Sequence, residues 1–332
     1  KFAFMAWFII TFVKSPRGLI FFLVTFMLVC MKMGQEGMVG QLSGSLVWQN
    51  QGVLRLHGST PMYRHPNSFS GMAVGTLPFI IAFFPIVNKW IKGLFIVQLF
   101  FSVNIILFTG SRTGWVATLL LLANMFLASK KKIKKIIIAV VVLVISVQYI
   151  PNEYQQRFES IFTLEEAEGS SSETRILILK DAWSIFMTNP FGVGVGAFPF
   201  VRRQNFGRIQ DTHNLYLEVA TNLGVQGLLV FVLLICKQLI ILRNISKEFK
   251  WNFQKIEQLK SGYLEDNQTL QKRYSELVIL YAASRAVFYF ILVRLYLGLF
   301  GMDLYEIYWW FSCGLTIALF NLRNVILKNE HK

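Results

Sequence analysis

The sequence predicts an all-α fold: a polytopic bundle of transmembrane helices with an extracytoplasmic loop that carries an amphipathic helix. The 332-residue chain is 54% hydrophobic and only 15% charged, whereas soluble chains are typically about a quarter charged. Several apolar runs approach the roughly 20 residues that cross a bilayer. These runs do not show the residue-by-residue alternation that marks the strands of a membrane β-barrel.

The formal net charge of +15 suggests two kinds of partner, nucleic acid or membrane. Much of the positive charge lies in short clusters between apolar runs, which is the topology signal of a membrane protein. No nucleic-acid-binding motif accompanies it. We therefore expect membrane lipids, and no nucleic acid, among the partners. The three cysteines each lie in an apolar run and are predicted to pack there, without a disulfide or a metal.

The apolar runs divide the chain into three parts. Residues 1–150 are predicted to form the N-terminal transmembrane helices, and residues 213–332 the C-terminal ones, with a charged, amphipathic, cytoplasmic basic segment at 243–276. Residues 151–212 form a long polar interval, which we expect to be an extracytoplasmic loop. Because the chain starts at Lys1 in apolar sequence, the number of runs is a minimum. The runs are 2–13, 18–33, 68–87, 93–109, 115–129, 136–150, 213–236, 277–300 and 307–326, and 34–67 is expected to be a loop.

Lysine placement predicts the topology. Five lysines lie within residues 130–135, and such a cluster is expected on the cytoplasmic side. Alternating outward from this cluster puts the other basic groups inside as well. It puts 34–67, the turn at Arg112, and 151–212 with His213 outside. Arg112, the long loop and His213 are therefore expected on one face.

The long loop contains a predicted amphipathic helix at 173–188. Apolar residues recur there at helical spacing, so the helix is expected to lie on the membrane or on the bundle. Ser170 and Glu173 fit a capping box, which places Arg175 in the first turn. A helix N-terminus with an arginine favours phosphate; the alternative is an anchor on lipid head groups. The apolar positions are Ile176, Leu179, Trp183 and Phe186.

A glycine-rich segment, 191–198, follows this helix. It is not a Walker loop, because no Gly-Lys-Ser/Thr follows, and we expect tight backbone packing instead. Arg202, Arg203 and Arg208 come next. They either attract an anionic lipid carrier or are solvated loop charges.

Two interpretations are also open for each of three other arginines. Arg112 either extends toward the membrane interface or binds a ligand. Arg285 and Arg294 lie within or beside an apolar run, where arginines are costly and often functional; the alternative is pairing with Asp303 or Glu306. His57 and His65 lack metal-ligand spacing, and no role is predicted for them.

The stretch from Asp211 to Gly227 is the centre of the prediction. It places His213 at the mouth of an apolar run, and histidine is the side chain most easily poised for proton transfer near neutral pH. Gly224 and Gly227 are expected to let another helix pack closely. Taken alone, His213 is better explained as an interfacial histidine bonded to its neighbours.

The sequence His213-Asn214, followed after nine residues by Gly224-Val225-Gln226-Gly227, resembles the signature of the O-antigen ligase family. The turn Gly110-Ser111-Arg112-Thr113-Gly114 resembles an outer-face arginine motif of that family. Thr174-Arg175 with Trp183 and Asn189-Pro190 resembles the stretch before the histidine, and Arg64-His65-Pro66-Asn67 resembles the first outer loop. The resemblance runs from about residue 55 to 325.

The resemblance implies a metal-independent, inverting glycosyltransferase of cell-surface polysaccharide biosynthesis that needs no cofactor. Its donor would be a glycan on undecaprenyl diphosphate at the outer face of the bacterial cytoplasmic membrane. Its acceptor would be lipid A-core, another glycan or a similar hydroxyl. His213 would be the general base, Arg112 and Arg175 would hold the diphosphate, and 151–212 would be the catalytic loop. Further substrate contacts are expected from Asn214, Arg202, Arg203, Arg285 and Arg294.

Elementary chemistry agrees with this assignment. An acceptor hydroxyl is a poor nucleophile, so a base with a pKa of about 6.5 helps it attack. The departing diphosphate gains negative charge, which guanidinium groups can stabilise. Two other classes stay open, a transporter or flippase of lipid-linked glycans and a scaffold subunit. Ligase and polymerase share the same chemistry and are not distinguished.

Overall fold

In the computed structural model, helices dominate the described residues, which are 2–50, 53–128, 152, 154–155, 171–263, 268–301 and 303–328. This confirms the predicted all-α fold class. The predicted run at 136–150, the cluster at 130–135 and almost all of 151–170 lie outside the described residues. The helices are α1 (Ala3–Phe12), α2 (Pro16–Ser43), α3 (Pro66–Phe83), α4 (Lys89–Phe108), α5 (Arg112–Leu127), α8 (Ser171–Thr188), α9 (Phe198–Phe206), α10 (Leu215–Tyr263), α11 (Gln268–Gly298) and α12 (Ile307–Lys328).

Local capping sets several helix starts. The Ser15 hydroxyl accepts a hydrogen bond from the Gly18 N–H at 3.1 Å, and Pro16 follows at the first helical position of α2. The Asn88 side chain caps α4 in the same way. At α5, the Ser111 hydroxyl accepts from the Gly114 N–H at 3.2 Å. Each cap satisfies an N–H that the helix itself leaves free.

The interval 34–67, expected to be a loop, is more ordered than predicted. α2 continues to Ser43, because small residues in its last turns pack against neighbours; Gly34 lies against Phe101 of α4. A two-stranded antiparallel hairpin follows, β1 (Val47–Asn50) with β2 (Val53–Leu56), in which Val47 faces Leu56. A short 3-10 helix, η1 (Pro61–Tyr63), leads to α3.

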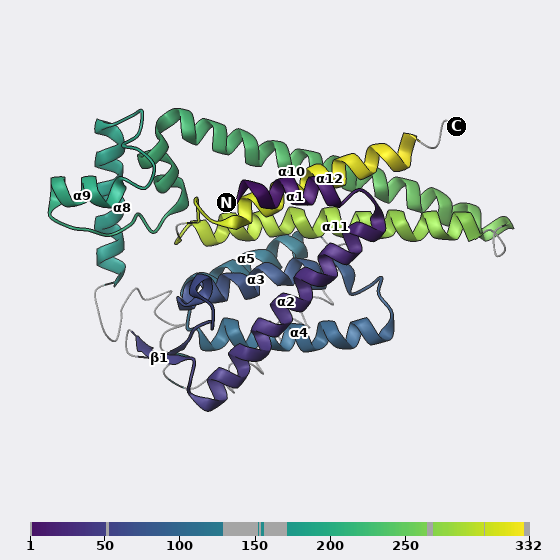
Figure 1. Ribbon diagram of the computed structural model, residues 1–332, viewed down its shortest axis with the longest axis horizontal. Helices are drawn as coiled ribbons and strands as arrows, with labels where there is room; N and C mark the ends of the chain where they lie inside the picture. The colour runs from purple at the N-terminus through teal and green to yellow at the C-terminus, as the bar shows by residue number, and fades with distance from the viewer. Residues whose placement is uncertain are drawn as a thin grey trace.

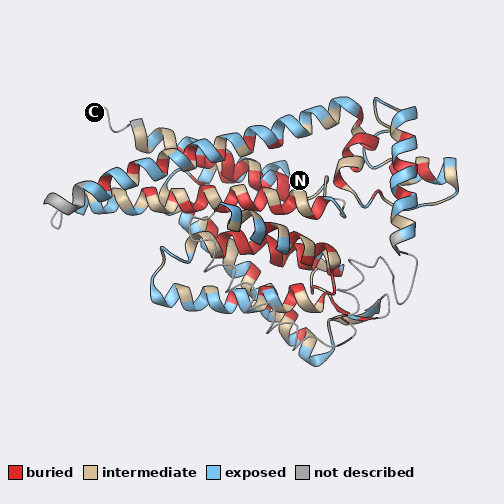
Figure 2. Ribbon diagram, turned by 180° about the vertical axis from the view of Figure 1, so that it is seen from behind, coloured by how far each residue is buried: buried red, intermediate tan, exposed pale blue. Residues whose placement is uncertain are grey.

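Two groups of helices meet at α3 and α11. One group contains α1, α10, α11 and α12, and the other contains α2 to α5; α11 packs on α3 and α5 and so joins them (Figure 1). α3 is buried continuously from Phe69 to Ile80, and Figure 2 shows buried residues gathered along the helices at this junction. A helix buried on all sides is typical of the centre of a bundle.

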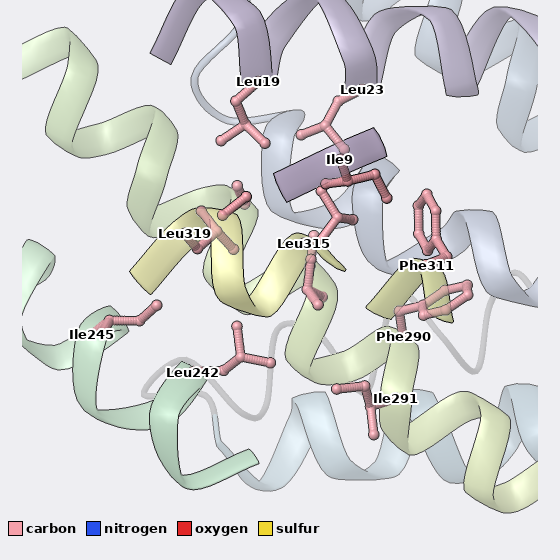
Figure 3. Packing of buried hydrophobic residues seen from close by; sticks show 14 of the residues in the cluster. Ile9, Leu19, Leu23, Leu242, Ile245, Phe290, Ile291, Phe311, Leu315 and Leu319 are labelled. Atoms are coloured by element: carbon pink, nitrogen blue, oxygen red, sulfur yellow. The ribbon is translucent and has the colours of Figure 1, made fainter. Parts of the chain in front are cut away.

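The larger apolar core joins the N-terminal and C-terminal helices. Ile9 of α1 and Leu23 of α2 point toward Leu315 of α12, and Phe290 of α11 lies beside Phe311 with ring centroids 5.3 Å apart (Figure 3). Interdigitated side chains of this kind are the main source of stability in a helical bundle.

Five of the described helices are long and apolar enough to cross a membrane, which together with the other apolar helices makes this a multi-pass membrane protein. They are Pro16–Ser43, Lys89–Phe108, Leu215–Gln258, Gln268–Gly298 and Ile307–Leu327. The segment 243–276, predicted to be charged and amphipathic, belongs to two helices where it is described: residues 243–263 end α10 and residues 268–276 begin α11. Phe253 and Tyr274 join the two helices there, with ring centroids 6.1 Å apart.

Three parts of the chain that are distant in sequence lie at one end of the bundle. Figure 1 places the hairpin, α8, α9 and the start of α10 at this end, together with the starts of α3 and α5. Figure 2 shows the same arrangement from behind. The turn at Arg112, the described part of the long loop and His213 are thus on one side of the helices.

Candidate functional site

A break in α10 shapes the site. Gly224 has a φ of 72° and a ψ of −170° within α10, so the helix is interrupted there. An ideal Cβ at Gly224 would lie 2.3 Å from the carbonyl carbon of Phe191, so only glycine fits. Gly224 was expected to admit a neighbouring helix; its neighbour is instead the backbone of the glycine-rich loop. This contact between the two backbones is the tight backbone packing predicted for residues 191–198.

The glycine-rich loop satisfies the backbone groups that the break leaves free. The N–H groups of Val193 and Gly194 donate to the carbonyls of Thr221 and Asn222, at 2.8 and 3.0 Å. The Val225 N–H donates to the Pro190 carbonyl at 2.8 Å. An interrupted helix in an apolar setting is tolerated only where its polar groups find such partners. The loop therefore fixes the short first part of α10 in place.

His213 precedes α10 in a strained conformation. Its φ is 48°, the only positive φ of a non-glycine residue in the described ranges. This left-handed region costs an L-residue about 1–2 kcal/mol, and such strain is concentrated at functional sites. The side chain of Asn214 holds the strained turn, because its oxygen accepts from the Leu217 N–H at 3.0 Å and its nitrogen donates to the Leu299 carbonyl at 3.1 Å. Asn214 was predicted to bind substrate; this geometry supports a positioning role.

Cationic side chains surround His213. Partial burial of the ring lowers its pKa below 6.5, and the nearby charges of Arg175 and Arg202 lower it further, while Asp211 raises it. The residue itself is exposed. It lies at the end of the bundle formed by the hairpin, α8, α9 and the start of α10, which we call the rim (Figure 1). A neutral imidazole in a cationic, open setting can accept a proton from a hydroxyl, and the same setting attracts an anion.

Arg175 reaches this rim from α8. The predicted helix 173–188 begins two residues earlier, at Ser171, so Arg175 lies one turn inside the helix and not in its first turn. Ser170 of the predicted capping box lies outside the described residues. Arg175 is half-buried. The structure thus brings together Arg175 and His213, two of the three residues predicted to be catalytic.

The apolar stripe predicted for α8 faces away from the protein. Ile176, Leu179 and Trp183 are exposed, and the exposed fraction of Trp183 is 56%. The opposite face packs on α9 and α10 through Ile178, Ala182 and other buried residues. Of the two placements expected for the stripe, membrane or bundle, the bundle is therefore excluded for these three side chains.

Arg202 is buried on α9 in an ion pair. Its Nε donates to Asp181 Oδ2 of α8 at 2.9 Å, and its Nη1 donates to Gln210 Oε1 at 3.0 Å. Nη2 is buried without a hydrogen-bond partner among the described residues. A solvated loop charge, one of the two expectations, is therefore wrong for Arg202. Arg203 is exposed, and Arg208 lies 3.8 Å from Asp181.

Sequence reasoning missed α9, although signals for it exist. Pro199 stands in its first turn, and Gly207 ends it with a φ of 70°. Proline just inside a start and glycine just past an end are common helix boundaries.

Arg112 begins α5 beside the start of α3. An ideal Cβ at Gly114 would lie 1.9 Å from the Ser70 hydroxyl oxygen, so α3 and α5 approach closely at this end. Arg55 of β2 reinforces this approach. Its Nε donates to the Thr109 carbonyl at 2.8 Å, and its Nη2 donates to the Asn67 side-chain oxygen at 2.8 Å. The turn that carries Arg112 is thus attached to the first outer segment.

The two arginines of α11 have partners within the bundle. Arg294 pairs with Asp303 and lies over the Tyr308 ring, 3.6 Å from its centroid. The predicted alternative of carboxylate pairing is therefore confirmed for Arg294. Arg285 contacts two rings instead, with Nη1 donating to the Tyr281 hydroxyl at 3.1 Å and the guanidinium 5.6 Å from the Tyr289 centroid. Neither arginine contributes to the electrostatic surroundings of His213.

His65, for which no role was predicted, caps α3 at the same end of the bundle as the other candidate residues (Figure 1). Partial burial lowers its pKa to about 4, and the charges of Arg55, His213 and Arg175 contribute to that shift. No short spacing in the sequence relates residue 65 to residues 175 and 213, so only the folded chain reveals this grouping. Among the described residues, no three His, Cys, Asp or Glu side chains gather as metal ligands.

Comparison with known protein families agrees with this geometry. The family model described as Wzy_C: O-Antigen ligase matches residues 97–232. The matched range includes Arg112, Arg175 and His213. A search of curated proteins finds no match. The family match supports a membrane enzyme of the O-antigen ligase or polymerase type in polysaccharide biosynthesis. Residues 97–232 of this chain thus match the O-antigen ligase family, which confirms the resemblance predicted from its motifs.

Proposed function

We propose that this protein transfers a glycan from undecaprenyl diphosphate to an acceptor hydroxyl at the outer face of the cytoplasmic membrane. The acceptor is lipid A-core, another glycan or a similar group. The observation that supports this most strongly is the strained His213 at an open rim with Arg175 in electrostatic contact. This reaction needs a base and a cation that acts in the same electrostatic surroundings.

His213 acts as the general base. Its lowered pKa keeps the ring neutral at pH 7, so the ring can take the proton of the acceptor hydroxyl. The hydroxyl oxygen then forms a bond to the anomeric carbon on the face opposite the diphosphate. The bond between that carbon and the diphosphate oxygen breaks with its electron pair, and the configuration inverts. The products are the new glycoside, the lipid diphosphate and a protonated His213.

The arginines stabilise the departing diphosphate. The charge of Arg175 acts on His213, and Arg112 begins α5 at the same end of the bundle as α8 (Figure 1). Guanidinium groups bind phosphate oxygens in pairs and keep their charge at any physiological pH. They can therefore supply the stabilisation of negative charge in a metal-independent transfer.

The remaining predicted substrate contacts differ in what supports them. Arg203 is exposed on α9 and is suited to a secondary contact with the carrier or its glycan. Arg202 is buried in its ion pair with Asp181, so its contribution is the effect of its charge on His213. Arg285 and Arg294 are held by tyrosines and by Asp303, and we assign them to the packing of the bundle.

A transporter or flippase of lipid-linked glycans is the alternative. Broken helices are common in transporters, where they lie near the middle of the membrane. The break at Gly224 instead lies close to the start of α10 and is closed by the glycine-rich loop. This placement favours an enzyme whose site is at the membrane surface.

The test is an assay of glycosidic bond formation. The purified protein, in lipid nanodiscs, is incubated with a lipid-diphosphate-linked glycan and candidate acceptors. Our proposal predicts a new glycoside together with released lipid diphosphate; a ladder of lengths identifies a polymerase and a single transfer a ligase. In proteoliposomes, movement of labelled lipid across the bilayer without bond formation would instead establish the flippase.

A further inference from the structure

The ring of His65 has a fixed orientation. His65 is the N-cap of α3, and its Nδ1 accepts a hydrogen bond from the Asn67 N–H at 3.2 Å. An accepting Nδ1 cannot also carry a proton, so the neutral ring is protonated at Nε2. The Nε2–H group is therefore the donor that His65 offers to its surroundings.

Hydrogen bonds of Arg55 fix Asn67, the residue that this cap contacts. The Asn67 side-chain oxygen accepts from Arg55 Nη2 at 2.8 Å, and Arg55 Nε donates to the Thr109 carbonyl at 2.8 Å. Arg55 is buried. The chain His65–Asn67–Arg55–Thr109 thus ties the imidazole to the end of α4, directly before the turn that carries Arg112.

His65 also lies near the opposite half of the site. The start of α3, which His65 caps, lies at the same end of the bundle as α8 and the start of α10 (Figure 1). His213 and Arg175 both lower the pKa of His65. His213 has the support of Asn214 on α10, and Arg175 comes from α8. His65 is thus connected to the Arg112 turn through hydrogen bonds and to the His213–Arg175 pair through space.

The charge around His65 favours an anion. Arg55, Arg175 and the titratable His213 act on His65. Around His213 there are also Arg202 and the opposing Asp211. Partial burial and the positive charges of Arg55 and Arg175, with a contribution from His213, lower the pKa of His65 to about 4. The ring therefore stays neutral at pH 7 and acts as a hydrogen-bond donor without adding charge. An anion bound among these groups would raise the pKa of His65.

We propose that His65 binds the diphosphate of the donor, donating its Nε2–H to a phosphate oxygen, with Arg55 and Asn67 as the residues that position its ring. The inference rests on the proposed function, since it takes the diphosphate as the ligand. It gives the first outer segment a direct contact with the donor through His65. This contact is additional to the roles assigned to His213, Arg112 and Arg175.

Two substitutions of His65 separate binding from folding. His65→Asn keeps the cap, because asparagine is a preferred N-cap residue, but removes the imidazole donor. His65→Ala removes both. The matched control is His57→Asn in the same outer segment, where the ring stacks near Trp48 and Nδ1 lies 3.0 Å from the Gly58 carbonyl oxygen.

The probe is inorganic pyrophosphate, titrated into the purified protein in neutral detergent and followed by calorimetry and by the ring resonances of His65. We expect wild type and His57→Asn to bind alike, and His65→Asn to bind about tenfold more weakly with an unchanged melting temperature. In wild type, pyrophosphate should raise the pKa of His65. A second arm adds phosphatidylglycerol vesicles, which should not displace the pyrophosphate.

Three results would overturn the inference: no binding of pyrophosphate to wild type, wild-type affinity in His65→Asn, or equal competition by a phospholipid, which would indicate a head-group site.

The failure of the proposed function is distinguishable from the failure of this inference. If pyrophosphate binding depends on His65 but no glycosidic bond forms with any acceptor, the diphosphate site stands and the transferase does not. If transfer occurs at the wild-type rate in His65→Asn, the transferase stands and the role of His65 does not.

Discussion

At the scale of single residues, the backbone of His213 carries the clearest functional signal. A positive φ of 48° persists only where the surroundings impose it, and the two hydrogen bonds of the Asn214 side chain do so. His213 therefore lies outside α10, where the residue is exposed.

The pH profile of transfer tests the surroundings of His213. Because its pKa lies below 6.5 and the neutral ring is the active form, kcat/KM should rise through an acidic limb below pH 6.5 and then level off. Arg175→Gln removes a positive charge, so the pKa and the limb should move to higher pH, with activity about tenfold or more lower because a diphosphate contact is lost. Asp211→Asn removes a negative charge, so the limb should move to lower pH.

Arg203→Gln serves as the control, since Arg203 is exposed on α9 and does not act on the pKa of His213. Its limb should coincide with that of wild type. Limbs that move in the same direction in Arg175→Gln and Asp211→Asn would show that the titrating group is not His213.

The structure groups some residues that the sequence singles out with others that it does not, for a physical reason. Arg175 and His213 were predicted from local pattern, and the pairing of Arg294 with Asp303 was among the expected alternatives. His65 and the buried Arg202–Asp181 pair were not, because their significance depends on contacts between segments far apart in the chain. A histidine that caps a helix shows no distinctive local pattern.

At the scale of elements, the break in α10 and the glycine-rich loop form one unit. The loop accepts and donates the hydrogen bonds that an unbroken helix would make internally. The side-chain amide of Gln226 adds a bond to the Phe191 carbonyl at 2.7 Å. The first part of α10, which follows His213 and Asn214, is thereby held by α8, α9 and the loop together.

Gly224→Ala should disrupt this unit. An added methyl group meets the Phe191 backbone, and the φ of 72° disfavours any L-residue by about 1–2 kcal/mol. We expect a lower melting temperature in detergent and loss of transfer. Gly93→Ala in α4 is the matched control, because nothing lies within 4 Å of a Cβ there and alanine favours a helix by about 1 kcal/mol. Equal melting temperatures for the two variants would contradict the role given to the break.

Elements with strong local signals were predictable, and those that depend on tertiary packing were not. α8 matched its predicted span to within two residues because its apolar spacing and the Asn189-Pro190 stop are local. The hairpin was not predicted, since it depends on the pairing of two short strands. The extension of α10 to Tyr263 and the start of α11 at Gln268 depend on contacts between the two helices, which charge patterning alone does not reveal.

At the scale of the whole molecule, the topology brings the candidate site residues to one end of the bundle. Long helices run between two ends, and the hairpin, the Arg112 turn, α8, α9 and the start of α10 share one of them (Figure 1). The lysine pattern predicts that this end faces outward. A lipid-linked donor in the outer leaflet would then meet His213 and Arg175 directly.

Cysteine labelling checks this orientation. In a background without Cys30, Cys236 and Cys313, new cysteines are placed at exposed residues of the two ends, Asn205→Cys on α9 and Lys89→Cys at the start of α4. A membrane-impermeant maleimide should label the first in intact spheroplasts and the second only after permeabilisation. The reverse pattern would place the site on the cytoplasmic side.

The central claim is that His213 is the base of a glycan transfer, and single-turnover kinetics of His213→Ala tests it most directly. With purified protein and a saturating lipid-diphosphate-linked glycan, we predict that the variant binds the donor as wild type does but forms the glycosidic bond at least about a hundredfold more slowly. Transfer by His213→Ala at the wild-type rate would contradict the account.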